Sequence, residues 1–293
     1  MVRCRTLLTT ALVCLAACTG GAAPEAKKEE AKAEAPKAAP AAKVEAPKPE
    51  IPPELAAEKL LAEVVEAAGG AAKFDAIKSY TYEMKVEIVG SGIAGTGKAW
   101  AKEGDFYLEI ALPGVGTSVA GGRGGKLWTQ DPIQGLRALS GKEAEMAAMG
   151  ASLNLAHDWR RFFDKAETTA VAAEGGKQYA DVTLTAKSGN SVTLRIDLES
   201  KRVVLQKTKQ YSSMGEIPVD VAVEDYRQQD GVWLSFAQTA DMKLQKMRTE
   251  VTKLELNVPV DESKFALPGS EPPPETKAAE TKAGEAKAAK PAK

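Results

Sequence analysis

Alternation of apolar and polar side chains over several segments between residues 80 and 256 restricts the fold more than any other feature of this chain. Successive side chains of a β-strand point to opposite faces of the sheet, so each alternating segment is expected to form a strand with one buried face. Turn signals at residues 188–190, 199–201 and 230–231 separate these segments, and short connections favour an antiparallel meander of about ten strands. The clearest segments are residues 80–88, 106–112, 182–186 and 194–198, with a less regular one at 251–256.

Helical periodicity precedes the strands and interrupts them once. Residues 60–68 place Leu60, Leu61, Val64, Val65 and Ala68 on one stripe, and Gly69-Gly70 is expected to end this helix. Ser140 and Glu143 have the spacing of a capping box, after which two apolar stripes run to residue 163. The prediction is a mainly β (α+β) fold: a curved antiparallel half-barrel with an N-terminal helix and helices plugging the concave face.

The folded part is expected to span residues 54–268, because composition changes on both sides of it. Residues 18–53 and 269–293 consist mostly of Ala, Pro, Lys and Glu, and have too few large apolar side chains to offset the entropy of folding. We therefore expect a disordered linker and a disordered tail. A flexible linker of this length spans roughly 30 Å on average, and over roughly 100 Å at full extension.

The first residues have the order of an export signal. Arg3 and Arg5 precede an apolar stretch at residues 7–15, which is too short for a transmembrane helix and ends in Leu-Ala-Ala-Cys18. This ending resembles the lipobox of bacterial lipoproteins, so residues 1–17 are predicted to be a removed signal peptide and Cys18 a lipidated anchor. The alternative is an ordinary secretory signal. Residue 19 is Thr rather than Asp, which the enterobacterial sorting rule associates with the outer membrane.

The other two cysteines, Cys4 and Cys14, lie in the predicted signal peptide, so the mature chain would hold no disulfide of its own. Its stability must then come from an apolar core. The formal net charge is −1, which does not suggest binding to nucleic acid.

Three stretches resemble the LolA/LolB superfamily of outer-membrane lipoprotein-sorting carriers. They are residues 124–132 (GGKLWTQDP), the pair 225–227 and 230–234 (DYR and DGVWL), and residues 260–265 (VDESKF). The resemblance extends over about residues 56–268. It implies an unclosed antiparallel barrel whose mouth is plugged by helices, and a carrier role for lipids or lipoproteins. The soluble carriers of that superfamily have no lipid anchor, and their ligand-gating arginine has no clear counterpart in this chain.

The sequence offers little for catalysis. His157 is the only histidine, stands beside Asp158 without a nucleophile motif, and is expected to be structural and partly buried. Gly121–Gly125 lacks the ending of a phosphate loop and is interpreted as a wide hairpin turn. Glu224, Asp225, Asp230 and Asp241 are interpreted as strand-face and turn residues. No metal, no cofactor and no enzymatic activity are predicted.

An apolar ligand cavity is the remaining candidate site. Strand alternation and the methionines of the helical segment predict a wall and a movable lid, since Met adapts to variable apolar ligands. The predicted lining residues are Tyr82, Met84, Phe106, Leu108, Trp128, Met146, Met149 and Trp159. The same residues could instead form an ordinary dry core. Two functions stay open: a non-enzymatic carrier of acylated ligands (a lipid or a lipoprotein) at the outer membrane, and a structural or accessory envelope lipoprotein with a self-filled barrel and no ligand. Other envelope proteins are candidate partners.

Overall fold

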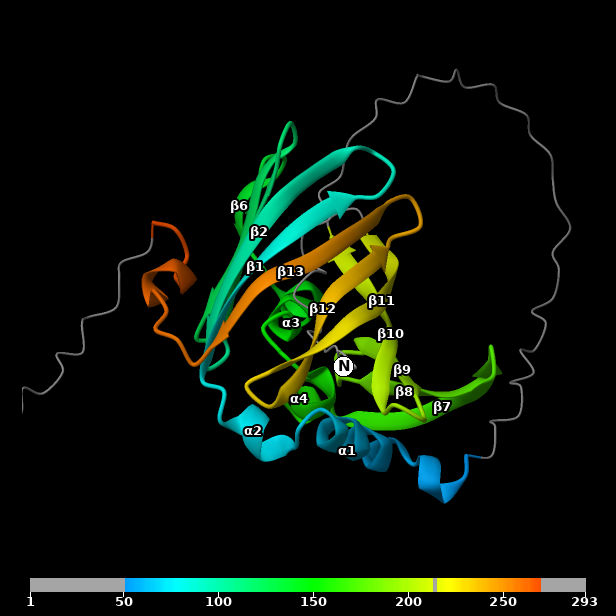
Figure 1. The fold of residues 1–293 in the computed structure, drawn as a ribbon. Coiled ribbons are helices and arrows are strands. Elements are labelled where there is room, and N and C mark those ends of the chain that lie inside the picture. Colours follow the sequence, from blue (N-terminus) through cyan, green and yellow to red (C-terminus); the bar gives the residue numbers. More distant parts are fainter. Residues whose placement is uncertain (1–50, 213–214, 270–293) are drawn as a thin grey trace, which may run out of the picture.

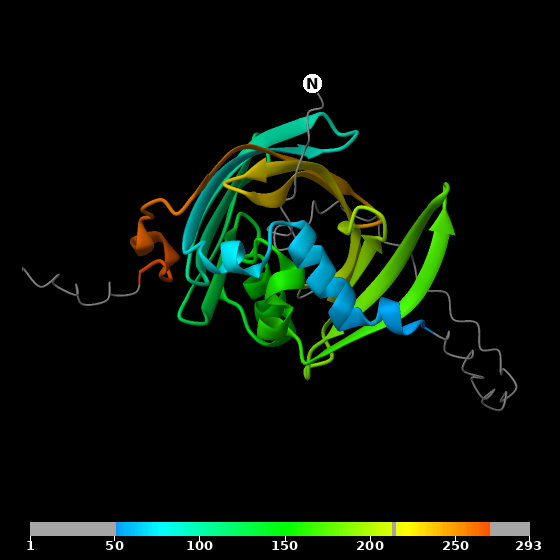
Figure 2. The same ribbon diagram turned by 60° about the horizontal axis from the view of Figure 1, so that its bottom comes forward.

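The computed structural model describes residues 51–212 and 215–269. The predicted signal peptide, Cys18, nearly all of the predicted linker and the predicted tail beyond residue 269 lie outside this range. The described part has a single curved antiparallel sheet with helices on its concave side (Figures 1 and 2). The predicted fold class is confirmed.

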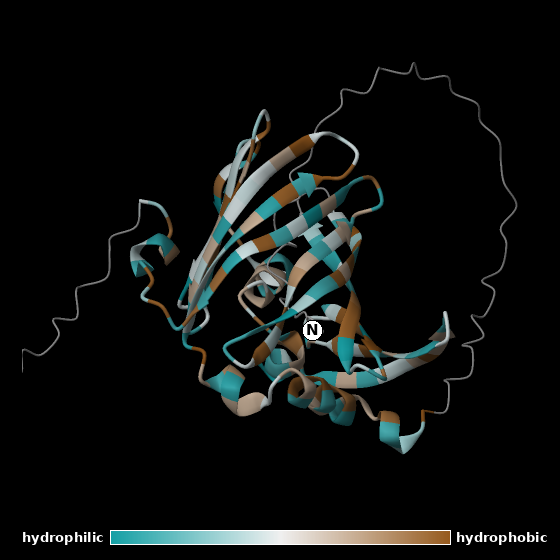
Figure 3. Ribbon diagram, in the orientation of Figure 1, coloured by the Kyte–Doolittle hydropathy of each residue, from teal (hydrophilic) through white to brown (hydrophobic). Residues whose placement is uncertain are grey.

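Thirteen strands form the sheet in the order β6-β5-β4-β3-β2-β1-β13-β12-β11-β10-β9-β8-β7. Apolar and polar residues alternate along the central strands, which gives the sheet one buried face and one solvated face (Figure 3). The strands are β1 Ser79–Ile88, β2 Ile93–Lys102, β3 Asp105–Leu112, β4 Gly116–Arg123, β5 Lys126–Asp131, β6 Gly135–Ala138, β7 Lys165–Glu174, β8 Lys177–Thr185, β9 Ser191–Asp197, β10 Arg202–Ser212, β11 Gly215–Gln229, β12 Val232–Asp241 and β13 Lys246–Leu256.

The strand order explains why helices occupy the concave side. The chain moves outward from β1 to β6 at one edge, and then resumes with β7 at the opposite edge. No pairing joins β6 to β7 within residues 51–212 and 215–269, so the sheet is not closed into a barrel. The segment that connects the two edges contains α3 (Gly141–Met149) and α4 (Leu155–Phe162). The buried residues of α3 and α4 pack against the inward-facing residues of the sheet, and α3 contacts both β5 and β10.

The N-terminal helix is α1 (Ala57–Ala67), which follows a 3₁₀ turn at Pro53–Leu55 and buries the predicted stripe. A tight turn at Gly69 leads into α2 (Ala71–Asp75). Gly69 has φ of +122°, and a Cβ atom there would come within 2.6 Å of the Gly231 carbonyl oxygen in the β11–β12 turn. Only glycine fits this close approach, which is reinforced by a 2.6 Å hydrogen bond from the Trp233 amide to the Ala68 carbonyl.

Two details differ from the sequence prediction. The sheet has thirteen strands rather than about ten, because Gly-rich segments such as β2 and β4 also form strands. The helix after Ser140 begins where predicted, but the Ser140 side chain makes no capping hydrogen bond. Glu143 instead accepts two hydrogen bonds, of 2.6 and 2.8 Å, from the Arg137 guanidinium on β6. A bidentate ion pair is stronger than a neutral capping bond, so the carboxylate turns toward the strand.

Candidate functional site

The concave face of the sheet is lined by side chains that the strand alternation directs inward. On β1, the alternate residues Tyr80, Tyr82, Met84 and Val86 are buried. Between them, Thr81 is half-buried and Glu83 and Lys85 are exposed. Small residues of β2 lie opposite the large ones, with Tyr82 paired with Ala99 and Met84 with Gly97. A Cβ atom on Gly97 would overlap the Met84 side chain, so the missing side chain of one strand makes room for the large side chain of the next.

The helices α3 and α4 cover this face. Met146, Met149 and Trp159 are all buried and belong to the same apolar cluster as the inward-facing strand residues. Thr208 on β10 donates a hydrogen bond to the Met146 sulfur across 4.0 Å. The structure therefore brings seven of the eight predicted lining residues into one cluster: Tyr82, Met84, Phe106, Leu108, Met146, Met149 and Trp159.

Trp128 lies apart from the other seven, on the convex face. Its ring contacts Tyr107 at 6.2 Å between centroids, and its indole N–H donates a 3.1 Å hydrogen bond to the Phe265 carbonyl. Phe265, at the end of the 3₁₀ helix η2 (Glu262–Phe265), is only 1% exposed. Leu127 and Trp128 are adjacent apolar residues of which only Leu127 joins the inner cluster, so alternation alone does not say which faces inward.

Little free space remains in one part of the interior. The cavity beside Tyr82, Phe106, Leu108 and Ala147 measures about 10 Å³, close to the volume needed for one water molecule. The Tyr82 hydroxyl is buried and has no hydrogen-bond partner in the described part of the chain. Burial raises its pKa well above the usual value. This region is therefore filled by the protein's own side chains.

Polar bonds attach α3 and the following loop to the sheet at their periphery. The Tyr80 hydroxyl donates a 2.9 Å hydrogen bond to the Ala151 carbonyl, in the loop between α3 and α4. On the opposite side, Ser188 and Asn190 each donate a 2.5 Å hydrogen bond to the Glu145 carboxylate. Apolar contacts hold the underside of α3, and these peripheral bonds fix its position.

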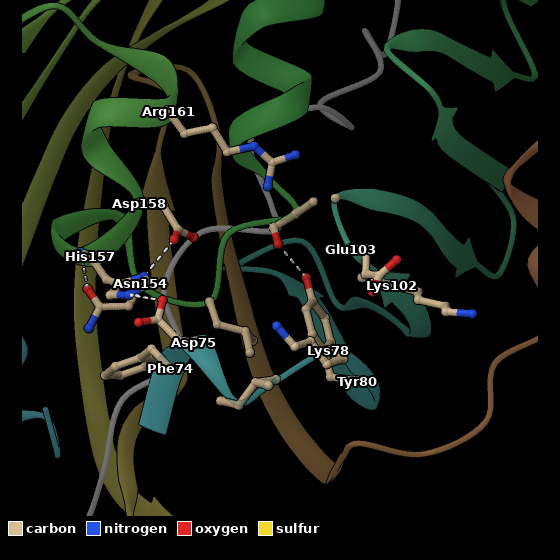
Figure 4. A pocket seen from close by; sticks show the side chains of 15 residues that line it. Phe74, Asp75, Lys78, Tyr80, Lys102, Glu103, Asn154, His157, Asp158 and Arg161 are labelled. Carbon is tan, nitrogen blue, oxygen red and sulfur yellow. Dashed lines mark hydrogen bonds and ion pairs between the residues drawn. The ribbon is translucent and has the colours of Figure 1, made fainter. Parts of the chain in front are cut away.

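A second, more polar cavity of about 330 Å³ opens between α2, α4 and the β2–β3 turn (Figure 4). We call it the vestibule. Tyr80 lines both cavities and forms the wall between them. The vestibule is lined by Phe74, Asp75, Ile77, Lys78, Tyr80, Ala101, Lys102, Glu103, Gly104, Ala151, Leu153, Asn154, His157, Asp158 and Arg161.

His157 links α4 to α2 at one side of the vestibule. Its Nδ1 lies 2.7 Å from an Asp158 oxygen, and its Nε2 lies 3.1 Å from an Asp75 oxygen. The hydrogen bond to Asp158 raises the pKa of His157, although burial opposes the shift. Burial also disfavours the charged Asp158, but hydrogen bonds from His157 and Ser152 outweigh it and hold the pKa of that carboxyl below its usual range. Both ring nitrogens face carboxylates, and the second oxygen of Asp158 accepts a 2.7 Å hydrogen bond from the Ser152 hydroxyl.

The other candidate groups have structural surroundings. Glu224 pairs with Arg248 at 2.7 Å, Asp225 with Arg227 at 2.5 Å, and Asp241 with Lys246 at 3.1 Å. Asp230 lies in the β11–β12 turn with a positive φ of 48°. Gly124-Gly125 forms a two-residue hairpin rather than a wide turn, since Arg123 pairs directly with Lys126. In residues 51–212 and 215–269, no group of three or more His, Cys, Asp or Glu side chains is placed to hold a metal ion.

The vestibule is the part of the site that sequence reasoning missed. Its charged residues come from the α2–β1 junction, the β2–β3 turn and α4, which are up to about eighty positions apart and share no motif. Arg161 and Lys78 look like ordinary surface residues in the sequence.

In the described ranges no helix has both the length and the apolar character needed to cross a bilayer.

Several solved structures resemble this chain. The LolA superfamily protein from Nitrosomonas europaea is 13% identical, with 72% of this chain and 97% of that chain covered and a TM-score of 0.50. A putative outer membrane lipoprotein-sorting protein domain from Vibrio parahaemolyticus is 10% identical, with coverages of 71% and 95% and a TM-score of 0.48. A DUF1329 family protein from Desulfovibrio piger is 12% identical, with coverages of 70% and 96% and a TM-score of 0.47. No protein-family model and no curated protein matches the sequence.

Proposed function

We propose that this chain, which has the LolA superfamily fold, is a lipid-anchored envelope lipoprotein that binds acylated ligands without catalysing a reaction. The proposal is carried by one observation. A continuous apolar cluster lies on the concave face of an open sheet and is covered by α3, which contacts β5 on one side and β10 on the other. Such a face can exchange the side chains of α3 for acyl chains at little cost in hydrophobic burial.

The methionines of α3 favour this exchange. Met146 and Met149 are unbranched, and their side chains adapt to neighbours of different shape. At its periphery the helix is attached by the Arg137–Glu143 ion pair and by hydrogen bonds to Glu145 and Ala151. A neutral hydrogen bond contributes about 0.5–1.5 kcal/mol and one to a charged group about 1.5–3 kcal/mol. We infer that α3 acts as a lid that swings away when a ligand enters.

The size of the ligand follows from its free energy of binding. Burying one methylene group contributes roughly 0.8 kcal/mol, whereas association costs on the order of 4–15 kcal/mol. A short fatty acid would barely bind. A long acyl chain, or several chains on one head group, would bind usefully, which favours acylated proteins or phospholipids over small metabolites.

Anchoring belongs to the same proposal. Cys18 would carry the lipid, and the linker to residue 53 would hold the domain roughly 30 Å from the bilayer, on the periplasmic side of the outer membrane. A tethered domain at this distance could take a ligand from a soluble partner or from the membrane surface.

Native mass spectrometry of the Cys18→Ser chain tests the proposal. We expect copurified lipid, and we expect a fluorescent long-chain fatty acid to bind. Met149→Glu should abolish binding of the fatty acid, because an unpaired carboxylate in the apolar cluster is costly. Met149→Leu, of similar volume, is the matched control and should retain binding.

The cavity of about 10 Å³ beside Tyr82 favours a second candidate function. In that case the interior stays filled by its own side chains, and the protein is a structural or accessory component of the envelope. Absence of copurified lipid, together with no binding of the fatty acid by the folded Cys18→Ser chain, would establish this alternative over the carrier.

A further inference from the structure

The vestibule is lined by charged side chains of both signs. Lys78, Lys102 and Arg161 supply cations, and Asp75, Glu103 and Asp158 supply carboxylates. His157 lies between Asp75 and Asp158, and Lys102 forms an ion pair with Glu262 outside the cavity. Within the described ranges, Lys78 and Arg161 are the lining cations that no ion pair holds, and Glu103 is the carboxylate that no ion pair holds. The charge of Arg161 also contributes to the lowered pKa of Asp158.

Neither Lys78 nor Arg161 forms an ion pair or a side-chain hydrogen bond in the described part of the chain. Arg161 reaches from the last turn of α4, where its guanidinium lies 5.4 Å from the Phe162 ring centroid. It extends over Gly104 in the β2–β3 turn, and a Cβ atom on Gly104 would overlap the guanidinium. The turn thus leaves room for Arg161 beside the cavity rather than pairing it.

Apolar residues continue from these cations toward the interior. Phe74, Ile77 and Leu153 line the vestibule together with Tyr80, whose ring also borders the inner cavity. The vestibule backbone at Ala151 directly follows Gly150, which lines the inner cavity. A molecule with a charged end and an apolar end therefore meets cations at the opening, and then apolar surface leading past Tyr80 to the underside of α3.

We propose that the vestibule binds the anionic head group, a phosphate or a carboxylate, of the amphiphile whose acyl chain occupies the concave face. Arg161 and Lys78 contact the head group, and the chain passes Tyr80. This inference rests on the proposed function, since it names the chemical class of the ligand at the same site. The guanidinium suits a planar or tetrahedral oxyanion because it offers several N–H donors in a fixed geometry.

Two probes with the same acyl chain test the inference on the full-length Cys18→Ser chain: a fluorescent long-chain fatty acid and its uncharged methyl ester. Arg161→Gln and Lys78→Gln should each lower the affinity for the fatty acid about two- to fivefold, which is the range for exposed charge pairs. The affinity for the ester should stay unchanged. Glu103→Gln removes a negative charge from the vestibule and should raise the affinity for the fatty acid by a similar factor. Misfolding would not raise this affinity. Arg160→Gln is the matched control, because the neighbouring Arg160 pairs with Glu58 at 2.8 Å outside the vestibule.

Each outcome has one meaning. If the fatty acid and the ester bind equally to every variant, the head-group site is refuted while acyl binding stands. If neither probe binds to any variant, the proposed function itself fails. A third outcome is that inorganic phosphate at millimolar concentration displaces the fatty acid completely and also binds alone with the same dependence on Arg161 and Lys78. The vestibule would then be a site for a free anion, and the proposal of an amphiphilic ligand would be refuted.

Discussion

The hydrogen bond between the Tyr80 hydroxyl and the Ala151 carbonyl offers a direct test of lid movement. It spans 2.9 Å and joins β1 to the loop that follows α3, and Tyr80 lines both cavities. Tyr80→Phe removes this hydroxyl and keeps the ring. Because the Ala151 carbonyl can reach water once the loop opens, the bond favours the closed state.

The magnitude follows from the value of one such bond. A net contribution of about 0.5–1.5 kcal/mol corresponds to a change of about two- to tenfold in the equilibrium between closed and open lid. If a ligand binds only to the open state, its apparent affinity rises by the same factor as the open population. We therefore expect Tyr80→Phe to bind a fluorescent long-chain fatty acid about two- to tenfold more tightly, although it lowers the free energy of unfolding.

Equilibrium titration and hydrogen exchange at residues 150–154 measure the two effects. Tyr226→Phe is the matched control, since the Tyr226 hydroxyl donates a hydrogen bond to the Val203 carbonyl and so joins β11 to β10, rather than to the loop that follows α3. That variant should lose stability without faster exchange in the loop or tighter binding. If Tyr80→Phe and Tyr226→Phe alter binding and exchange equally, the hydroxyl of Tyr80 does not hold the lid and our argument is refuted.

Three further predictions concern the anchor, the convex face and pH. Cys18→Ser should move the protein from the membrane fraction to the soluble periplasmic fraction on cell fractionation; a variant that still pellets with membranes would contradict the lipidation. Phe265→Ala should lower the free energy of unfolding by about 3–5 kcal/mol in denaturant titrations, because the ring is 1% exposed and lies against the sheet. His157→Gln should cost more stability at pH about 5.5 than at pH about 8.5, since a raised folded-state pKa stabilises the protein below the unfolded pKa and this contribution disappears as pH rises through the folded pKa. Equal losses at both pH values would show that protonated His157 does not stabilise the fold.

Local patterns in the sequence are sufficient for much of the architecture. The alternation at residues 80–88 predicts a strand with Tyr82 and Met84 on its buried face, and the stripe ending at Ala68 predicts α1. Both patterns follow from the geometry of a single element, period two for a strand and 3.6 for a helix, so no tertiary information is required. The helical interruption near residues 141–162 is predicted for the same reason.

Strands whose packing depends on a neighbour are harder to predict. The β2 segment contains Gly95 and Gly97, which weaken an isolated strand, yet Gly97 is needed where the Met84 side chain crosses from β1. The same holds for Gly121, where a Cβ atom would meet the Trp128 ring at 2.5 Å. A glycine opposite a large side chain is favourable only once the two strands are paired, and that pairing is a property of the sheet.

Two features of the site arise only in the tertiary structure. The strand register pairs Leu127 with Gly122, which itself pairs with the inward-facing Phe106, so Trp128 faces outward. On that side its indole N–H donates a hydrogen bond to the Phe265 carbonyl. The vestibule exists because the sheet order places α4 beside α2 and the β2–β3 turn, which brings Arg161 to Gly104. The sequence by itself determined the alternation, the helical stripes and the predicted lipidation signal, because each depends on neighbouring residues. The side of the sheet on which Trp128 lies and the set of charged residues around the vestibule depend on contacts between separate segments, which only folding creates.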